Sequence, residues 1–86
     1  MFVIVTYDVN AKRVAKVMKT CRKYLTHVQK SVFEGMITEA KLHRMKTDIA
    51  TKICPQEDSV NIYRLDSLKF ASKESIGLNK SDDNIL

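Results

Sequence analysis

Residues 1–9 read MFVIVTYDV, an almost unbroken run of β-branched, aliphatic and aromatic side chains. Such a run is typical of a central β-strand covered on both faces, because a strand with one wet face alternates apolar and polar residues. The single charged residue of the run is Asp8, next to its end. We therefore expect a folded domain organised around this strand, with Asp8 where the strand leaves the core.

Directly after this strand the apolar spacing changes from that of a strand to that of a helix. Over residues 11–25 the apolar side chains recur with a period near 3.6, and Asn10 is a suitable N-cap. At about 100° per residue, four lysines gather within about 60° of one another opposite the apolar stripe. They are Lys12, Lys16, Lys19 and Lys23. This helix is expected to have an apolar face for the core and a cationic outer face.

The remaining segments continue the alternation of strands and helices. Residues 27–37 return to strand character, with Gly35 marking a bulge, a bend or the strand end. Residues 39–53 have helical spacing and are halted by Pro55. Residues 60–65 predict another strand, and residues 68–76 give a weaker strand signal.

This order of elements predicts the α+β class, as a ferredoxin-like βαββαβ fold. The sheet is expected to be antiparallel, with both helices on one face. Residues 1–77 are predicted to form one ferredoxin-like domain, followed by a polar C-terminal tail over residues 78–86.

Charge and cysteine content narrow the class of protein further. The chain carries a net charge of +5, and residues 1–33 hold seven basic residues against Asp8 alone. Such an asymmetry favours a polyanionic partner such as nucleic acid. Cys21 and Cys54 lack the spacing of a metal or disulfide framework, and no apolar run has the length that crosses a bilayer. A cytoplasmic protein without a membrane partner is expected, and no zinc site is predicted.

Asp8 and the lysine row each have two interpretations. Asp8 is suited to bind Mg²⁺, or it tightens the turn into the helix by local hydrogen bonds. One carboxylate per chain is a small metal site, but a symmetric dimer would bring two copies together. The lysine row is either a solvated outer face or a surface that follows a phosphate backbone.

Three segments together resemble the CRISPR-associated Cas2 family. They are Tyr7-Asp8-Val9 with Arg13 shortly after it, residues 28–35 with the sequence VQKSVFEG, and residues 58–65 with the sequence DSVNIYRL. The resemblance extends through Gly77 and implies a ferredoxin-like fold and a homodimer. It also implies a C-terminal segment that pairs with the sheet of the partner subunit, a role that would fall to residues 84–86 here.

The resemblance implies two functions of different class. One is a scaffold that holds duplex DNA and bridges integrase dimers during spacer acquisition in CRISPR adaptation, an antiviral defence. The other is a Mg²⁺-dependent endonuclease on RNA or DNA, with Asp8 of each subunit as catalytic residue and metal ligand. The predicted nucleic-acid-binding residues are Lys12, Arg13, Lys16, Lys19 and Lys23.

One departure from the family pattern bears on the metal. Family members often continue the aspartate with further acidic residues, whereas this chain continues with residues 10–13, NAKR. Metal binding therefore depends on Asp8 alone within one chain. A toxin-type metal-dependent ribonuclease and a metabolic regulator are alternatives, because one fold serves several functions.

Overall fold

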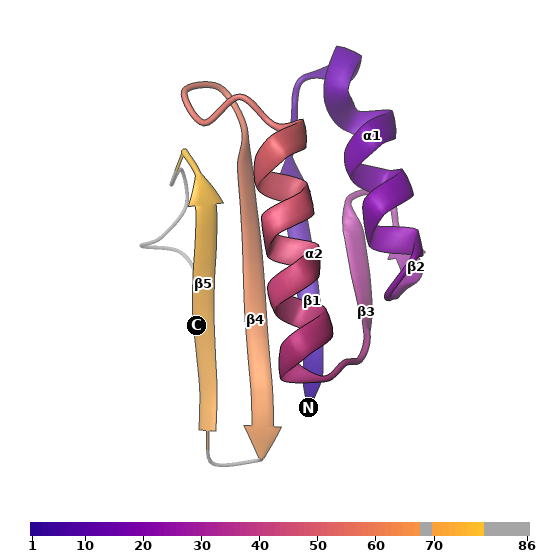
Figure 1. The fold of residues 1–86 in the computed structure, drawn as a ribbon, viewed down its shortest axis with the longest axis vertical. Coiled ribbons are helices and arrows are strands. Elements are labelled where there is room, and N and C mark those ends of the chain that lie inside the picture. The colour runs from indigo at the N-terminus through magenta and orange to yellow at the C-terminus, as the bar shows by residue number, and fades with distance from the viewer. Residues whose placement is uncertain (68–69, 79–86) are drawn as a thin grey trace.

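The computed structural model describes residues 1–67 and 70–78, which form two helices and five strands (Figure 1). In chain order they are β1 (Phe2–Asp8), α1 (Ala11–Arg22), β2 (Thr26–Gln29), β3 (Val32–Met36), α2 (Glu39–Lys52), β4 (Ser59–Ser67) and β5 (Phe70–Gly77). The strands pair antiparallel in the order β2-β3-β1-β4-β5. The predicted α+β, ferredoxin-like class is confirmed, and β1 is the central strand.

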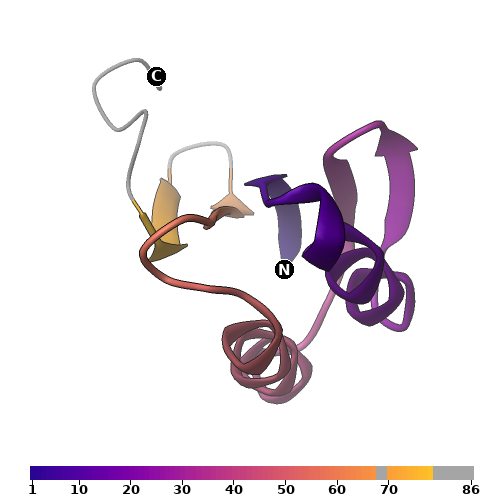
Figure 2. The same ribbon diagram turned by 90° about the horizontal axis from the view of Figure 1, so that it is seen from above.

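The sheet has one face covered by both helices and one face that carries neither, as Figure 2 shows. Side chains of β1 alternate between the two faces because successive residues of a strand point to opposite sides. Val3, Val5 and Tyr7 are buried toward the helices, in one core with Phe33 and Ile62. The helices therefore cover only half of the apolar surface that β1 presents.

Both helices begin after a residue whose side chain caps the helix, Asn10 for α1 and Thr38 for α2. The Asn10 side chain accepts a hydrogen bond from the Lys12 N–H at 3.1 Å, which confirms the predicted N-cap of α1. Helix α1 ends at Arg22, earlier than the apolar spacing predicts. The chain closes there in a turn, because the Leu25 N–H donates to the carbonyl of Cys21 at 2.8 Å. Leu25 is buried although it lies outside the helix.

The prediction of one strand over residues 27–37 is wrong. The segment is a hairpin of β2 and β3, with Lys30 and Ser31 in the turn and an irregular register between His27 and Gln29. Backbone contacts with β1 fix the turn, since the Tyr7 N–H donates to the Ser31 carbonyl at 3.2 Å. The turn contains neither Gly nor Pro, so no local signal marks it in the sequence.

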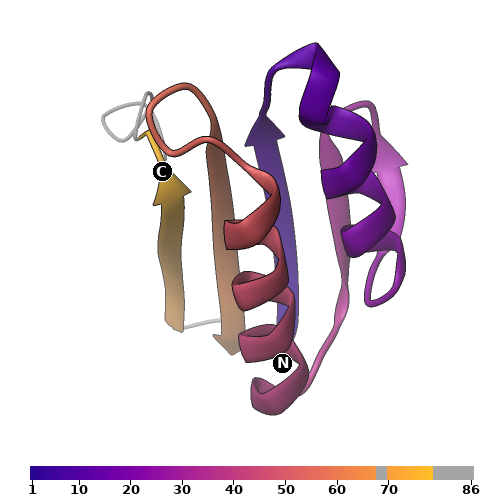
Figure 3. The same ribbon diagram turned by 45° about the horizontal axis from the view of Figure 1, so that its top comes forward.

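Four segments converge at the end of the molecule where β1 stops. The β1–α1 loop, the start of α1, the α2–β4 loop and the end of β5 all lie there (Figures 1 and 3). Strand β5 pairs with β4 of its own chain as far as Gly77 opposite Ser59. Of the predicted tail, only Leu78 is described, so the predicted pairing of residues 84–86 with a partner lies outside the described residues. In the described part of the chain, neither helix has the length and apolar character to span a membrane.

Candidate nucleic-acid interface and carboxylate centre

Asp8 is the last residue of β1 and is exposed. Its backbone pairs with Ser59 of β4, and strand alternation places its side chain on the face opposite the helices, with Phe2, Ile4 and Thr6. Helix α1 is capped by Asn10 instead of Asp8. The geometry thus puts a surface carboxylate at the exit of the central strand.

The sheet face without helices, called the open face, carries apolar side chains together with polar ones such as Thr6, Glu34 and Asn61. Cross-strand register places six apolar side chains on it: Phe2, Ile4, Val32, Met36, Tyr63 and Leu65. Met36 is 70% exposed and Leu65 is 38% exposed, so part of this apolar surface is accessible to solvent. No described helix or strand covers this face (Figure 2). Asp8 therefore shares a face with these apolar side chains, but the polar Thr6 and Asn61 separate it from most of them.

The residues around Asp8 limit how a metal ion could bind. Within residues 1–67 and 70–78, no three His, Cys, Asp or Glu side chains form a cluster that could hold one. Mg²⁺ needs only one or two carboxylates and takes its other ligands from water and phosphate. A single chain thus fits Mg²⁺ as half of a site, with the remaining ligands supplied from outside the described chain.

The predicted lysine row is exposed along α1. Lys12, Lys16, Lys19 and Lys23 all have exposed side chains. Lys16, Lys19 and Lys23 line a groove of about 370 Å³ together with Thr20 and with Lys52 of α2. Among the described residues, no carboxylate lies within ion-pair distance of Lys16 or Lys19. The packing of α2 against α1 therefore places Lys52, which is ion-paired with Asp48, beside the row that the sequence predicts.

Asp48 is the one carboxylate that contacts this groove in the described part of the chain. Its Oδ1 lies 2.5 Å from the Lys52 Nζ, and its Oδ2 accepts from the Thr20 hydroxyl at 3.2 Å and lies 3.9 Å from the Lys23 Nζ. Hydrogen bonding to Lys52 lowers the pKa of Asp48, so it stays ionised. Sequence reasoning missed Lys52, because only its i,i+4 spacing from Asp48 is visible before α1 and α2 are placed together.

Arg13 differs from the neighbouring lysines because it is paired inside the protein. Its Nε lies 2.6 Å from the Asp58 Oδ2, and its Nη2 lies 3.1 Å from the Asp58 Oδ1 and 2.8 Å from the Glu57 Oε1. These hydrogen bonds from Arg13, with those from the Cys54 and Asn10 N–H groups, hold the pKa of the buried Asp58 well below its usual range. The contact of Arg13 with nucleic acid stays a prediction. Within the protein, Arg13 is bound by Asp58 and Glu57.

The histidines and cysteines form no second centre among the described residues. The His27 ring stacks on Phe33 with centroids 4.5 Å apart, and His43 is exposed on α2. Both cysteines are free thiols, and burial raises the pKa of Cys21 to about 12, which keeps it protonated and unreactive.

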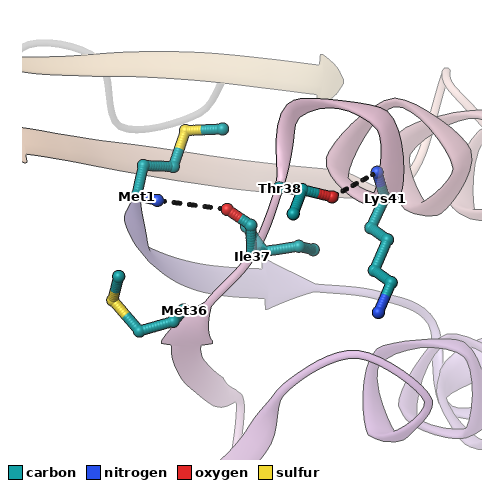
Figure 4. Close-up of a pocket in the computed structure, with 5 residues that line it drawn as sticks. All are labelled: Met1, Met36, Ile37, Thr38 and Lys41. Carbon is teal, nitrogen blue, oxygen red and sulfur yellow. Dashed lines mark hydrogen bonds between the residues drawn. The ribbon is translucent and has the colours of Figure 1, made fainter.

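A separate hollow lies at the start of β1, the end of the strand opposite Asp8 (Figure 4). It has a volume of about 240 Å³ and is lined by Met1, Met36, Ile37, Thr38 and Lys41. The Met1 amino group donates to the Ile37 carbonyl at 3.2 Å, and the Thr38 hydroxyl caps α2. None of the predicted site residues lines this hollow.

The fold and the site define a class of protein: a small ferredoxin-like domain with a carboxylate at the end of its central strand and a cationic first helix. The family model for the CRISPR associated protein Cas2 matches residues 1–73. This chain belongs to the Cas2 family, which confirms the resemblance seen in the sequence.

Curated relatives match almost the whole chain. The CRISPR-associated endoribonuclease Cas2 of Thermotoga maritima is 44% identical over 86 residues, covering 100% of this chain and 99% of the relative. The protein of the same name from Dictyoglomus turgidum is 44% identical over 81 residues, covering 94% of this chain and 93% of the relative.

Solved structures of Cas2 proteins share the fold. A crystal structure of Streptococcus pyogenes Cas2 at pH 6.5 is 39% identical with a TM-score of 0.71, covering 76% of this chain and 86% of that chain. A second Cas2 crystal structure is 36% identical with a TM-score of 0.75, covering 100% of this chain and 97% of that chain.

Proposed function

We propose that this protein acts in CRISPR adaptation as a homodimer that binds nucleic acid and cleaves phosphodiester bonds at a centre formed by two copies of Asp8. The observation that carries the proposal is the position of Asp8, an exposed carboxylate at the end of the central strand, on the open face. Relatives that match nearly the full chain are named CRISPR-associated endoribonucleases, which supports the chemistry. Nucleic acid as partner agrees with the predicted cytoplasmic location.

The open face supports the homodimer. Burying apolar surface contributes about 25 cal/mol per Å², and side chains such as Met36 and Leu65 are exposed in one copy. A twofold interface uses the same patch of both subunits. Because Asp8 shares this face with the apolar residues, pairing through the open face brings two carboxylates to one interface.

The two carboxylates and the lysines have separate tasks in the reaction. When bound, Mg²⁺ polarises a phosphate oxygen and makes a bound water more acidic. Asp8 of each subunit would hold the ion, and each chain provides one of the carboxylates. The lysines of α1 would neutralise backbone phosphates and hold the bound nucleic acid.

The lysine row supports binding that does not depend on base sequence. Phosphate contacts set affinity and register but carry no sequence information. Helix α1 spans about 18 Å, enough to follow several phosphates of one strand. We therefore propose Lys12, Lys16, Lys19 and Lys23 as phosphate ligands, with Arg13 as a further contact from the same helix.

The same surface suits the finer role implied by the family, a scaffold that holds duplex DNA between integrase dimers. A scaffold needs phosphate contacts without sequence preference, and the exposed lysines of α1 provide them. Mixing the protein with duplex DNA and a purified integrase subunit is expected to give a ternary complex by size-exclusion chromatography. Separate elution of the integrase would contradict the scaffold role.

The nuclease is tested by comparing wild type with Asp8→Asn on labelled single-stranded RNA and duplex DNA, with Mg²⁺ or a chelator. We expect wild type to cleave with Mg²⁺ and not with the chelator, and Asp8→Asn to cleave in neither condition. Glu34→Gln is the matched control, because it removes one negative charge from the same open face, where Glu34 pairs with Ile4. Equal cleavage by Asp8→Asn and wild type would show that Asp8 is not catalytic. If wild type and both variants bind nucleic acid without cleaving it, the nuclease proposal fails and only the scaffold role remains.

The homodimer is tested by sedimentation. Wild type is expected to sediment at twice the 9.9 kDa of one chain, and Ile4→Glu on the open face at the mass of one chain. Lys41→Glu, an exposed position on α2, is the control and should remain dimeric. A wild-type protein that sediments as a single chain at micromolar concentration would contradict the proposal.

A further inference from the structure

Asp58 is a fully buried carboxylate and directly precedes Ser59, the residue of β4 that pairs with Asp8 at the end of β1. Its Oδ1 accepts from the Asn10 N–H at 2.9 Å and from Arg13 Nη2 at 3.1 Å. Its Oδ2 accepts from the Cys54 N–H at 2.9 Å and from Arg13 Nε at 2.6 Å. Each carboxylate oxygen thus has two donors from the protein itself, and the Asp58 side chain is shielded from solvent.

The backbone of Asp58 joins two further segments. Its N–H donates to the Cys54 carbonyl at 2.8 Å, and its carbonyl accepts from the Leu78 N–H at 2.7 Å. Gly77 makes this approach possible: its φ is +88°, and a Cβ there would lie 2.3 Å from the Asp58 carbonyl oxygen. One residue therefore binds the β1–α1 loop, α1, the end of α2 and the exit of β5.

Two segments linked to Asp58 flank Asp8. Along the chain, Asn10 lies two residues after Asp8 and is held by the Asp58 carboxylate. Across the sheet, Ser59 pairs with Asp8 and directly follows Asp58. Asp8 is the last residue of its strand, a position where strands open most easily. Its backbone is thus fixed from two sides by contacts that meet at Asp58.

We infer that Asp58, with Arg13, is the positioning residue of the Asp8 centre. The inference rests on the proposed function of Asp8. A group that holds a metal ion or substrate must be placed within about 0.5 Å, and an error of about 1 Å can cost about 100-fold in rate. Asp58 acts through the backbone on both sides of Asp8 and touches no reacting atom. A purely structural ion pair would stabilise the fold without this selective effect on Asp8.

The test compares Asp58→Asn with Glu74→Gln. Asp58→Asn keeps the side-chain shape but removes the charge that Arg13 binds. Glu74→Gln also breaks an ion pair, with Lys46 at 2.6 Å, but lies on β5 away from the Asp8 end.

At a temperature where both variants are folded, kcat and KM are measured on labelled RNA with Mg²⁺. We expect Asp58→Asn to lower kcat about 10-fold to 100-fold with KM changed less than about twofold. Glu74→Gln should leave both within about twofold of wild type.

A second readout does not depend on activity. Backbone ¹⁵N relaxation is expected to show lower order parameters for residues 8–10 in Asp58→Asn and unchanged values in Glu74→Gln. If wild type does not cleave, the proposed function fails, and this readout alone decides the positioning role. Unchanged order of residues 8–10, or equal losses of kcat in both variants, would overturn the inference.

Arg13→Lys keeps the proposal testable if Asp58→Asn does not fold. A lysine preserves the positive charge but lacks the planar fork that contacts both oxygens of Asp58. The expected result is a smaller loss of order at residues 8–10 in the same direction. Residues 8–10 as ordered as in wild type would overturn the role of the Arg13–Asp58 pair.

Discussion

Lys12 and Arg13 are consecutive basic residues at the start of α1, yet they belong to two different regions of the molecule. Lys12 is exposed and continues into the row formed by Lys16, Lys19 and Lys23. Arg13 binds the buried Asp58 at 2.6 Å, and its side chain is only 21% exposed. Positive charge that is counted in a sequence is therefore not all available to a partner.

The two regions differ in what their charges contribute. Removing one member of a buried ion pair leaves an uncompensated charge and strongly destabilises the folded state. Exposed lysines contribute little to stability but attract phosphates. We therefore expect substitutions near Asp58 to change the free energy of unfolding, and substitutions in the lysine row to change the affinity for nucleic acid.

The largest expected effect is the loss of stability in Asp58→Asn. The free energy of unfolding should fall by about 2 to 3 kcal/mol, since the hydrogen bonds from Arg13 to a charged carboxylate are lost. Urea unfolding followed by circular dichroism at a fixed protein concentration measures it. Lys16→Gln is the control and should stay within about 0.5 kcal/mol of wild type. Equal losses in the two variants would remove the distinction between the regions.

A slightly smaller effect is expected for binding in the double variant Lys16→Gln, Lys19→Gln. Its affinity for duplex DNA should fall about 30-fold near 0.1 M salt, and the slope of log K against log salt should decrease by about 2. The matched control is Lys41→Gln, Arg44→Gln, which removes the same charge from exposed positions of α2. Fluorescence anisotropy at several salt concentrations measures both, and equal weakening by the control would mean that net charge alone governs binding.

The pH dependence of stability gives a third comparison. Arg13 holds the pKa of Asp58 well below its usual range in the folded state, whereas in the unfolded chain Asp58 binds a proton near about pH 4. Below that pH the unfolded state binds more protons, so stability falls as pH falls. Wild type should lose about 1 kcal/mol per pH unit more than Asp58→Asn below about pH 4.

Asp48 and Glu74 provide the internal reference for this comparison. Their pKa values are lowered by hydrogen bonds with Lys52 and Lys46, so both contribute in the same direction in the two proteins. The difference between wild type and Asp58→Asn therefore isolates Asp58. Parallel stability curves from urea unfolding between about pH 5 and pH 2.5 would contradict the assignment.

The smallest effect is expected for Glu57→Gln. Glu57 also contacts Arg13, at 2.8 Å, but its side chain is 57% exposed. Exposed ion pairs contribute little, so the free energy of unfolding should change by less than about 0.5 kcal/mol. Urea unfolding of Glu57→Gln and Asp58→Asn under the same conditions measures this change. A loss as large as that of Asp58→Asn would show that burial does not separate the two carboxylates.

Much of the fold could be predicted because its elements carry local patterns. The apolar run of β1, the helical spacing after Asn10 and the breaker Pro55 mark their elements directly in the sequence. The hairpin between β2 and β3 could not be predicted, because Lys30 and Ser31 have no turn signature and are held by contacts with Tyr7. Two parts of the candidate site could also be predicted. The position of Asp8 at the end of an apolar run predicts a surface carboxylate, and the helical spacing of the lysines predicts their exposed face.

Periodicity and residue type are local properties, so the chain alone indicated the elements other than the β2–β3 hairpin, the cationic side of α1 and the place of Asp8 at a strand end. Tertiary packing assigned Arg13 to Asp58, 45 positions away in the chain, and placed Lys52 beside the α1 lysines. It also left several apolar side chains of the sheet uncovered by the helices, on the same face as Asp8. These relations join segments that are distant in sequence, and only the close approach of those segments in the folded domain determines which charge is neutralised and which remains available.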